Sequence, residues 1–170
     1  MSHPTPPQKI KGSGSIIGKP APDFCLRSAD GKDVRLADVL ATGPALLAFY
    51  PGDFTQICTR QLCGYQESYD KFQSFGVNLY GISSNSSESH LAFASQYKFA
   101  FPLLSDPWKE TAKAYGCTSL LMLGSVTRAV FVINAKGLIL YRYVEPTVFT
   151  HRSADELLGI LGDLKKNGLI

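Results

Sequence analysis

The chain has little charge and no long apolar run, and both shortages limit what it can be. Charged residues make up 18% of its 170 residues, and the formal net charge is only +3. The basic residues are scattered, apart from Lys9 and Lys11 near the start and the pair Lys165 and Lys166 near the end. This distribution is typical of solvated surface lysines, so we expect no nucleic-acid partner. No apolar run approaches the roughly 20 residues of a membrane-spanning helix, so we expect no membrane partner either.

Patterns for metal and nucleotide binding are also missing. The three histidines, His3, His90 and His151, are far apart and match no metal-ligand spacing. Two of the four cysteines are five residues apart, but no second ligand pair accompanies them, so a zinc site is not expected. The chain has neither the Walker nor the Rossmann glycine pattern. We therefore expect no bound metal and no nucleotide cofactor.

The length predicts one ordinary domain with a sizeable core. Residues 1–15 combine prolines with a Gly-Ser-Gly-Ser run, which favours a flexible N-terminal arm, and residues 16–170 are expected to form the domain. The first eleven residues are polar and lack the apolar core of a secretory signal peptide. We therefore expect a cytoplasmic protein, in which thiols stay reduced and a disulfide is catalytic and transient.

Hydrophobic periodicity predicts strands and helices that alternate along the chain. The expected strands are residues 24–27, 32–36, 45–50, 77–83, 127–133 and 138–144. The expected helices are a short turn at 36–40 and longer segments at 55–74, 88–97, 109–115 and, after a Ser153 cap, up to about residue 166. This order predicts an α/β fold in which helices flank both faces of a mixed central β-sheet.

The most informative segment joins an expected strand to an expected helix. The apolar run of the strand breaks at Pro51, and Cys58 falls in the opening turn of the helix that follows. The unpaired N–H groups and the positive dipole end at that position favour a thiolate. Thr55, three residues earlier, is placed to cap the helix and to hydrogen-bond the sulfur or an oxygen that approaches it.

Cys63 follows Cys58 by five residues. On an ideal helix two Cα atoms at that spacing are roughly 8–9 Å apart, which exceeds the roughly 7 Å limit for a disulfide. The pair therefore indicates a thiol that reacts first and a partner that reaches it only if the helix unwinds. The alternative interpretation of Cys63 is an inward-facing helix residue with no chemical role.

These residues resemble a known family. Pro51, Thr55 and Cys58 match the Pro-x3-Thr/Ser-x2-Cys signature of the peroxiredoxins, and the second cysteine resembles the bacterioferritin-comigratory-protein (PrxQ) branch. Residues 18–24 and 101–106 resemble further segments of that family, and 127–134 resembles the strand that carries its active-site arginine; the likeness covers about residues 16–165. The resemblance implies a thioredoxin-like fold and a thiol peroxidase that reduces hydrogen peroxide and organic hydroperoxides.

The resemblance also implies roles for individual residues. Cys58 is then the peroxidatic cysteine, which attacks the terminal oxygen of a peroxide and becomes a sulfenic acid. Arg128 is a permanent cation beside the thiolate, and Pro51 shields the thiolate from water. Cys63 resolves the sulfenic acid as an intrachain disulfide, and thioredoxin or a similar dithiol reductant regenerates the pair without metal, haem or flavin. Because an intrachain bond needs no second subunit, we expect a monomer.

Two positions depart from the family's pattern, and one role stays open. Gln61 stands where glutamate is common; an amide keeps the hydrogen-bonding capacity and can orient Arg128. Ile57 stands where a glycine often precedes the cysteine, and its side chain narrows the approach to the sulfur. Cys25 and Cys117 lie in apolar or turn surroundings and are expected to be spectators, although Cys117 remains an alternative resolving cysteine.

Two other functions share part of this pattern. A disulfide oxidoreductase on the same fold needs Cys-x2-Cys rather than Cys-x4-Cys, and it has no use for the arginine. A redox sensor, which passes its oxidation to a partner protein, begins with the same chemistry. Rapid turnover of peroxide with thioredoxin alone would separate the enzyme from the sensor.

Overall fold

Within residues 16–170, which are the residues that this computed structural model describes, seven strands form one mixed sheet. They are β1 (Cys25–Ser28), β2 (Asp33–Arg35), β3 (Ala45–Phe49), β4 (Asn78–Ser83), β5 (Leu103–Ser105), β8 (Ala129–Ile133) and β9 (Ile139–Val144). Their order across the sheet is β2-β1-β5-β4-β3-β8-β9. A separate small hairpin consists of β6 (Thr118–Ser119) and β7 (Ser125–Val126). The predicted flexible arm, residues 1–15, lies outside the described residues.

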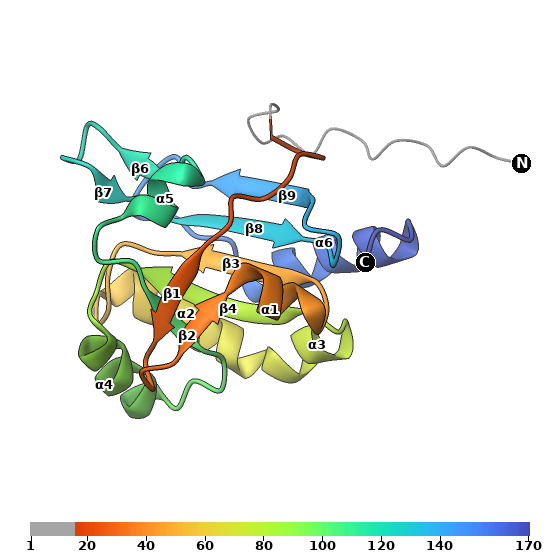
Figure 1. Cartoon of the computed structure of the whole chain (residues 1–170). Helices are drawn as coiled ribbons and strands as arrows, with labels where there is room; N and C mark the ends of the chain where they lie inside the picture. The colour runs from red at the N-terminus through yellow and green to blue at the C-terminus, as the bar shows by residue number, and fades with distance from the viewer. Residues whose placement is uncertain (1–15) are drawn as a thin grey trace, which may run out of the picture.

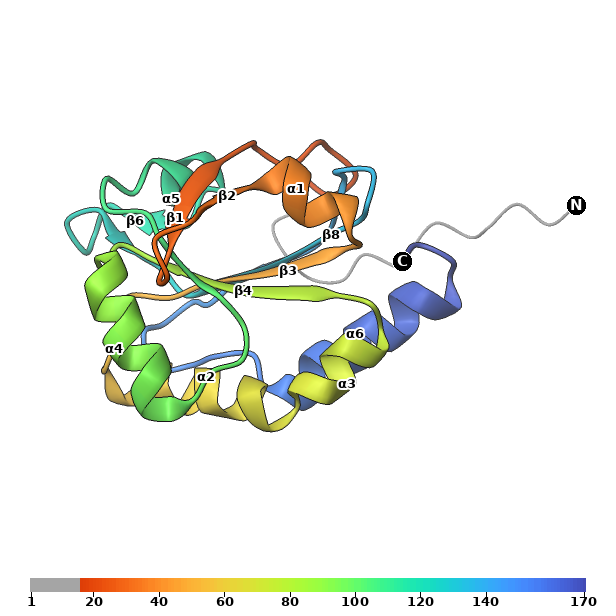
Figure 2. The same ribbon diagram turned by 60° about the horizontal axis from the view of Figure 1, so that its bottom comes forward.

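Helices cover both faces of the sheet, as the order of elements predicts. They are α1 (Leu36–Ala41), α2 (Gln56–Glu67), α3 (Tyr69–Ser74), α4 (Ser87–Tyr97), α5 (Glu110–Ala114) and α6 (Ala154–Lys166). Figure 2 shows α2, α3, α4 and α6 on one side of the sheet and α1 and α5 on the other. None of the helices within residues 16–170 combines the length and the apolar character that a bilayer span requires.

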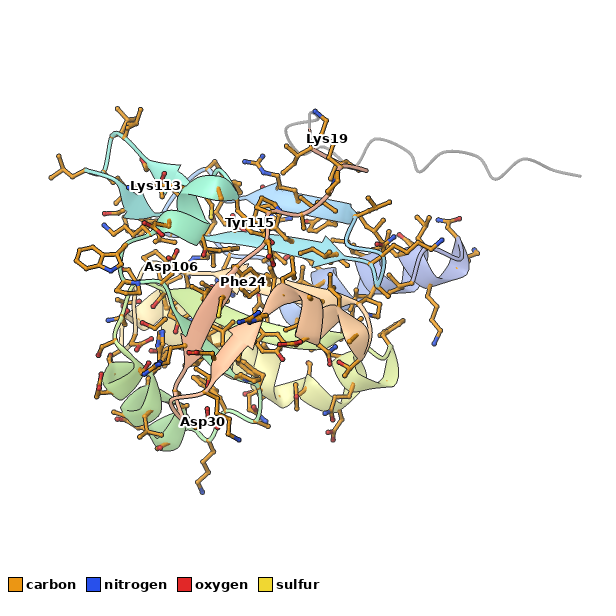
Figure 3. The ribbon with its side chains drawn as sticks, viewed as in Figure 1. Lys19, Phe24, Asp30, Asp106, Lys113 and Tyr115 are labelled. Carbon is orange, nitrogen blue, oxygen red and sulfur yellow. The ribbon has the colours of Figure 1, made fainter. Side chains whose placement is uncertain are left out.

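The sheet divides the interior into two cores, and its inner strand β3 contributes to both. All five residues of β3 are fully buried, because alternate side chains of a strand point to opposite faces and both faces are covered. Leu46 and Ala48 pack into a first core with α2, α3, α4 and α6. The other three residues pack into a second core with α1 and α5, where Figure 3 labels Phe24 and Tyr115.

The strand register gathers several loops at one edge of the sheet, at the left in Figure 1. Phe49, the last residue of β3, pairs with Ala129, the first residue of β8, and Ala129 also pairs with Val144 at the end of β9. Strand β4 runs parallel to β3, so its C-terminal end lies at the same edge. The loops that follow β3, β4 and β9 therefore meet the residues that precede β8.

The structure differs from the sequence prediction in three places. The helix predicted at 55–74 is interrupted at Ser68, whose N–H bonds to the carbonyl three residues back, at Tyr65. Serine is a weak helix former, so the break separates α2 from α3 where propensity is low. The short strand β5 and the β6–β7 hairpin were not predicted, because two or three residues are too few to show a period.

Candidate active site

The loop after β3 places Cys58 in the first turn of α2. Thr55 occupies the N-cap position with an extended backbone, and the N–H of Thr59 bonds to its carbonyl at 2.9 Å. The Thr55 hydroxyl instead donates to the carbonyl of Gly52 at 3.1 Å and makes no cap hydrogen bond. The predicted side-chain cap is therefore wrong: the hydroxyl closes the turn that begins after the half-buried Pro51.

Arg128 reaches Cys58 from the neighbouring strand. It precedes β8 directly, and its own carbonyl accepts a hydrogen bond from the N–H of Glu145, which extends the pairing of β8 with β9. The side chain is buried, with 4% of the residue exposed, and its Nη1 lies 3.2 Å from Cys58 Sγ. Cys58 has no exposed surface. A guanidinium at this distance and in this burial provides the countercharge that a buried sulfur anion would need.

A chain of hydrogen bonds holds Arg128 in this position. Its Nη1 donates to Gln61 Oε1 at 2.6 Å, the Gln61 amide donates to the Tyr65 hydroxyl at 2.8 Å, and that hydroxyl donates to the Arg152 carbonyl at 2.8 Å. The direction of each hydrogen bond in this chain is determined, because the guanidinium at one end can only donate and the backbone carbonyl at the other end can only accept. Burial raises the pKa of Tyr65, so its proton stays in the chain.

No carboxylate within residues 16–170 forms an ion pair with Arg128. Its further contact is a long one of 3.5 Å from Nη2 to the Val148 carbonyl. The charge of Arg128 also acts on a neighbouring side chain. Burial and then the Arg128 cation lower the pKa of the half-buried His151. A glutamate in place of Gln61 would neutralise the guanidinium, whereas the amide orients it and leaves its positive charge directed at Cys58.

The other three cysteines lie in different surroundings, and all four thiols are free. Cys63 is half-buried on the same helix as Cys58, and burial followed by the charge of Glu67 raises its pKa. Cys117 is fully buried in the second core, where its thiol donates to the Ala112 carbonyl at 3.3 Å and burial raises its pKa strongly. Cys25 is exposed on β1.

Sequence reasoning missed Tyr65 and Asp53. Tyr65 follows Gln61 by four residues, so the helical spacing alone shows that the two side chains are neighbours. Asp53 lies inside the Pro51–Thr55 segment and is buried, and a buried carboxylate needs partners. One of its partners is His90, which the sequence analysis considered only as a metal ligand.

Comparison with known proteins assigns the family. A model of the AhpC/TSA family matches residues 17–142. The chain belongs to the AhpC/TSA family. Its curated relatives include the chloroplastic peroxiredoxin Q of Triticum aestivum, which is 36% identical and is matched over 82% of this chain and 66% of its own length. That of Sedum lineare is also 36% identical, over 87% of this chain and 78% of its own length. The chain thus spans only part of each relative's length.

Solved structures agree with this assignment. Peroxidoxin BcpB from Mycobacterium tuberculosis superposes with a TM-score of 0.79 at 30% identity, covering 88% of this chain and 97% of that one. The bacterioferritin comigratory protein of Xanthomonas campestris has a TM-score of 0.74 at 26% identity, covering 82% and 90%. The resemblance to PrxQ-type peroxiredoxins and the thioredoxin-like fold are confirmed, and membership of the family supports a thiol-dependent peroxidase activity.

The expectation of a cytoplasmic location is contradicted by the same comparison, because the curated relatives are chloroplastic proteins. The expectation rested on a missing apolar signal core. The lack of that core does not distinguish the cytosol from the interior of an organelle.

Replacing Arg128 with methionine tests its effect on the sulfur. We expect Arg128→Met to slow the alkylation of Cys58 by iodoacetamide at neutral pH by about tenfold, because the reacting sulfur loses the cation that lies 3.2 Å from it. Peptide mass spectrometry measures the rate at Cys58 separately from the other thiols. The matched control is Arg60→Met, which removes an exposed, solvent-screened cation from α2, the helix that carries Cys58. Equal rates in Arg128→Met and the wild type would contradict the assignment.

Proposed function

We propose that this protein is a thiol peroxidase in which Cys58 is the nucleophile. The observation that carries the proposal is the 3.2 Å contact between Cys58 Sγ and Arg128 Nη1 at the start of α2, away from solvent. The thiolate sulfur attacks the terminal oxygen of the peroxide, so that an S–O bond forms as the O–O bond breaks, and the sulfur becomes a sulfenic acid. The leaving oxygen takes a proton from solvent and departs as water or, from an organic hydroperoxide, as an alcohol.

Arg128 has a donor left for the substrate. Its Nε is buried and has no hydrogen-bond partner among the described residues, whereas Nη1 is already committed to Cys58 and Gln61. A peroxide oxygen beside the guanidinium would satisfy that donor while negative charge develops on the leaving oxygen. Organic hydroperoxides are included as substrates because a structural neighbour, the Xanthomonas campestris protein, is described by its alkyl peroxide reduction activity.

Cys63 is proposed as the resolving cysteine. Its sulfur attacks the Cys58 sulfenic acid, an S–S bond forms, and water leaves. Cys58 and Cys63 lie on one continuous helix, so α2 must unwind locally before the bond can form. Cys117 is a poorer candidate, because it packs in the second core while Cys58 packs in the first, with the sheet between them. A dithiol reductant such as thioredoxin then restores both thiols by disulfide exchange, and one subunit suffices.

Substitution can distinguish the proposed roles of Cys58 and Cys63. Cys58→Ser should abolish peroxide turnover. Cys63→Ser should keep the first oxidation but block the cycle driven by thioredoxin, so that the sulfenic acid persists and over-oxidises to the sulfinic acid. Non-reducing peptide mapping after one equivalent of peroxide identifies the bond. A Cys58–Cys117 peptide would exclude Cys63 as the resolver, and oxidation without turnover by thioredoxin would favour a redox sensor.

Hydrogen exchange tests the proposed unwinding. In the reduced protein, the amides of residues 59–64, which have helical acceptors, should be protected, and in the disulfide form the same amides should exchange fast. Three residues of the segment are weak helix formers, since Ile57 and Thr59 are β-branched and Gly64 is flexible. Helix α3 should stay protected in both states, because the break at Ser68 separates it from α2 and its Phe72 is fully buried.

The control for the exchange experiment is the Cys63→Ser protein after treatment with peroxide. It carries an oxidised Cys58 but cannot form the bond, so it should keep the protection of the reduced wild type. Equal protection of residues 59–64 in the reduced and the disulfide forms of the wild type would rule out local unwinding.

The resolving step should accelerate as the pH rises above neutrality. Burial and the charge of Glu67 raise the pKa of Cys63, so at neutral pH the attacking sulfur is mostly protonated, and raising the pH produces more thiolate. Glu67→Gln removes the second cause and should speed the step about two- to threefold at low salt and neutral pH. Asp70→Asn, an exposed carboxylate on α3, is the matched control. Single-turnover loss of sulfenic acid gives the rate, and a pH-independent rate would contradict this account.

A further inference from the structure

A second buried pair of ionisable side chains connects the loop that carries Pro51 and Thr55 to helix α4. The carboxylate of Asp53 and the imidazole of His90, from α4, have no exposed side-chain surface. His90 Nδ1 lies 2.8 Å from Asp53 Oδ2 and 3.0 Å from Oδ1. Neither residue forms a hydrogen bond with Cys58 or Arg128, and the mechanism described above makes no use of them.

Hydrogen bonds account for all the polar side-chain atoms of this pair. His90 Nε2 lies 3.1 Å from the Leu104 carbonyl, which can only accept, so Nε2 carries a hydrogen. The hydroxyls of Tyr50 and Ser89 donate to the Asp53 carboxylate at 2.6 and 2.8 Å. His90 Nδ1 lies within hydrogen-bonding distance of both oxygens of Asp53. Every polar side-chain atom of the pair therefore has a partner among the described residues.

This pair restrains the loop between β3 and α2. The side chain of Asp53 is bound from three directions, by Tyr50, Ser89 and His90, and its backbone N–H donates to Asn85 Oδ1 at 3.0 Å. The next residue, Phe54, has a φ of 61°, which is uncommon for a bulky side chain and persists only where the surroundings impose it.

The restrained loop ends where the catalytic helix begins. Thr55 follows Phe54 directly and is the N-cap of α2, and Cys58 lies three residues further on. A rotation of the loop at Asp53 would move the first turn of α2 relative to Arg128, which is fixed to the sheet at β8. The contact between the Cys58 sulfur and the Arg128 guanidinium thus depends on two attachments. The sheet fixes Arg128, and α4 fixes the loop that precedes α2.

We propose that Asp53 and His90 are positioning residues for peroxide reduction, which hold Thr55 and the first turn of α2 in register with Arg128. This inference rests on the proposed function of Cys58. Packing alone does not account for the pair, because apolar residues of similar volume fill a core at least as well as a buried ion pair. An ion pair instead imposes one geometry, and a displacement of about 1 Å at a reacting group can change a rate about a hundredfold.

The test compares two reactions of Cys58 in the full-length protein. Oxidation by hydrogen peroxide needs the sulfur, Thr55 and Arg128 in register around the O–O bond, whereas alkylation by iodoacetamide depends on the sulfur and its countercharge alone. Because His90→Leu also loosens the contact of Cys58 with Arg128, we expect alkylation to slow by no more than the roughly tenfold expected for Arg128→Met, and oxidation to slow by about 100-fold. His90→Asn keeps a donor at the position of Nδ1, so it should recover most of the oxidation rate.

Two further variants separate positioning from stability. Ser86→Ala removes the N-cap of α4, whose hydroxyl accepts from the Ser89 N–H, and should destabilise that helix without changing the ratio of the two rates. Tyr50→Phe removes one hydrogen bond from Asp53 and keeps the ring, so it should give a smaller fall in oxidation. If His90→Leu does not fold, the ratio of rates in Tyr50→Phe decides the question.

The outcomes distinguish this inference from the function on which it rests. If Cys58 of the wild type is not oxidised by peroxide, both fail. If the wild type is oxidised and the variants at His90 and Tyr50 have the same ratio of oxidation to alkylation, only the positioning role fails. If oxidation and alkylation change together in every variant, the pair acts through stability alone and the inference is overturned.

Discussion

The arrangement depends on one buried contact, in which Arg128, which has no carboxylate partner within residues 16–170, faces the sulfur of Cys58. A buried cation and a buried thiolate are each unfavourable alone, and together they compensate each other. The rest of the site maintains this compensation. Gln61, Tyr65 and the Arg152 carbonyl fix the guanidinium without neutralising it. The start of α2 adds its unpaired N–H groups on the side of the sulfur.

Helix α2 has two opposite requirements under the proposed mechanism. It must be well formed in the reduced protein, because its first turn presents Cys58 to Arg128, and it must open when the disulfide forms. The structure divides these requirements along the chain. Gln61 and Tyr65 attach the middle of the helix to its surroundings, while the break at Ser68 separates it from α3. Opening of residues 56–64 would therefore break the contacts of Arg128 with Cys58 and Gln61 and withdraw Leu62 from the first core, while Phe72 of α3 would keep its packing there.

The two cores explain why the thiols of one chain are so different. The sheet separates Cys117 from Cys58, and dense apolar packing keeps the Cys117 thiol protonated and inaccessible. Cys63 shares a helix with Cys58 and is only half-buried. Position relative to the sheet, and not distance along the sequence, is thus the reason to propose Cys63 as the partner of Cys58.

Much of the fold could be predicted from the sequence, because strands and helices follow from local periodicity and from turn residues. The strand at 45–50, the Ser153 cap and the placement of Cys58 in the first turn of a helix are of this kind. The break at Ser68, the interaction of Gln61 with Tyr65, and the burial of Asp53 against His90 could not, because they depend on which surfaces meet. The sequence by itself determined the reactive motif, since its spacing is local. Only the tertiary structure decided how Arg128, 70 residues further along the chain, reaches the sulfur, because sheet register is set by contacts between distant strands.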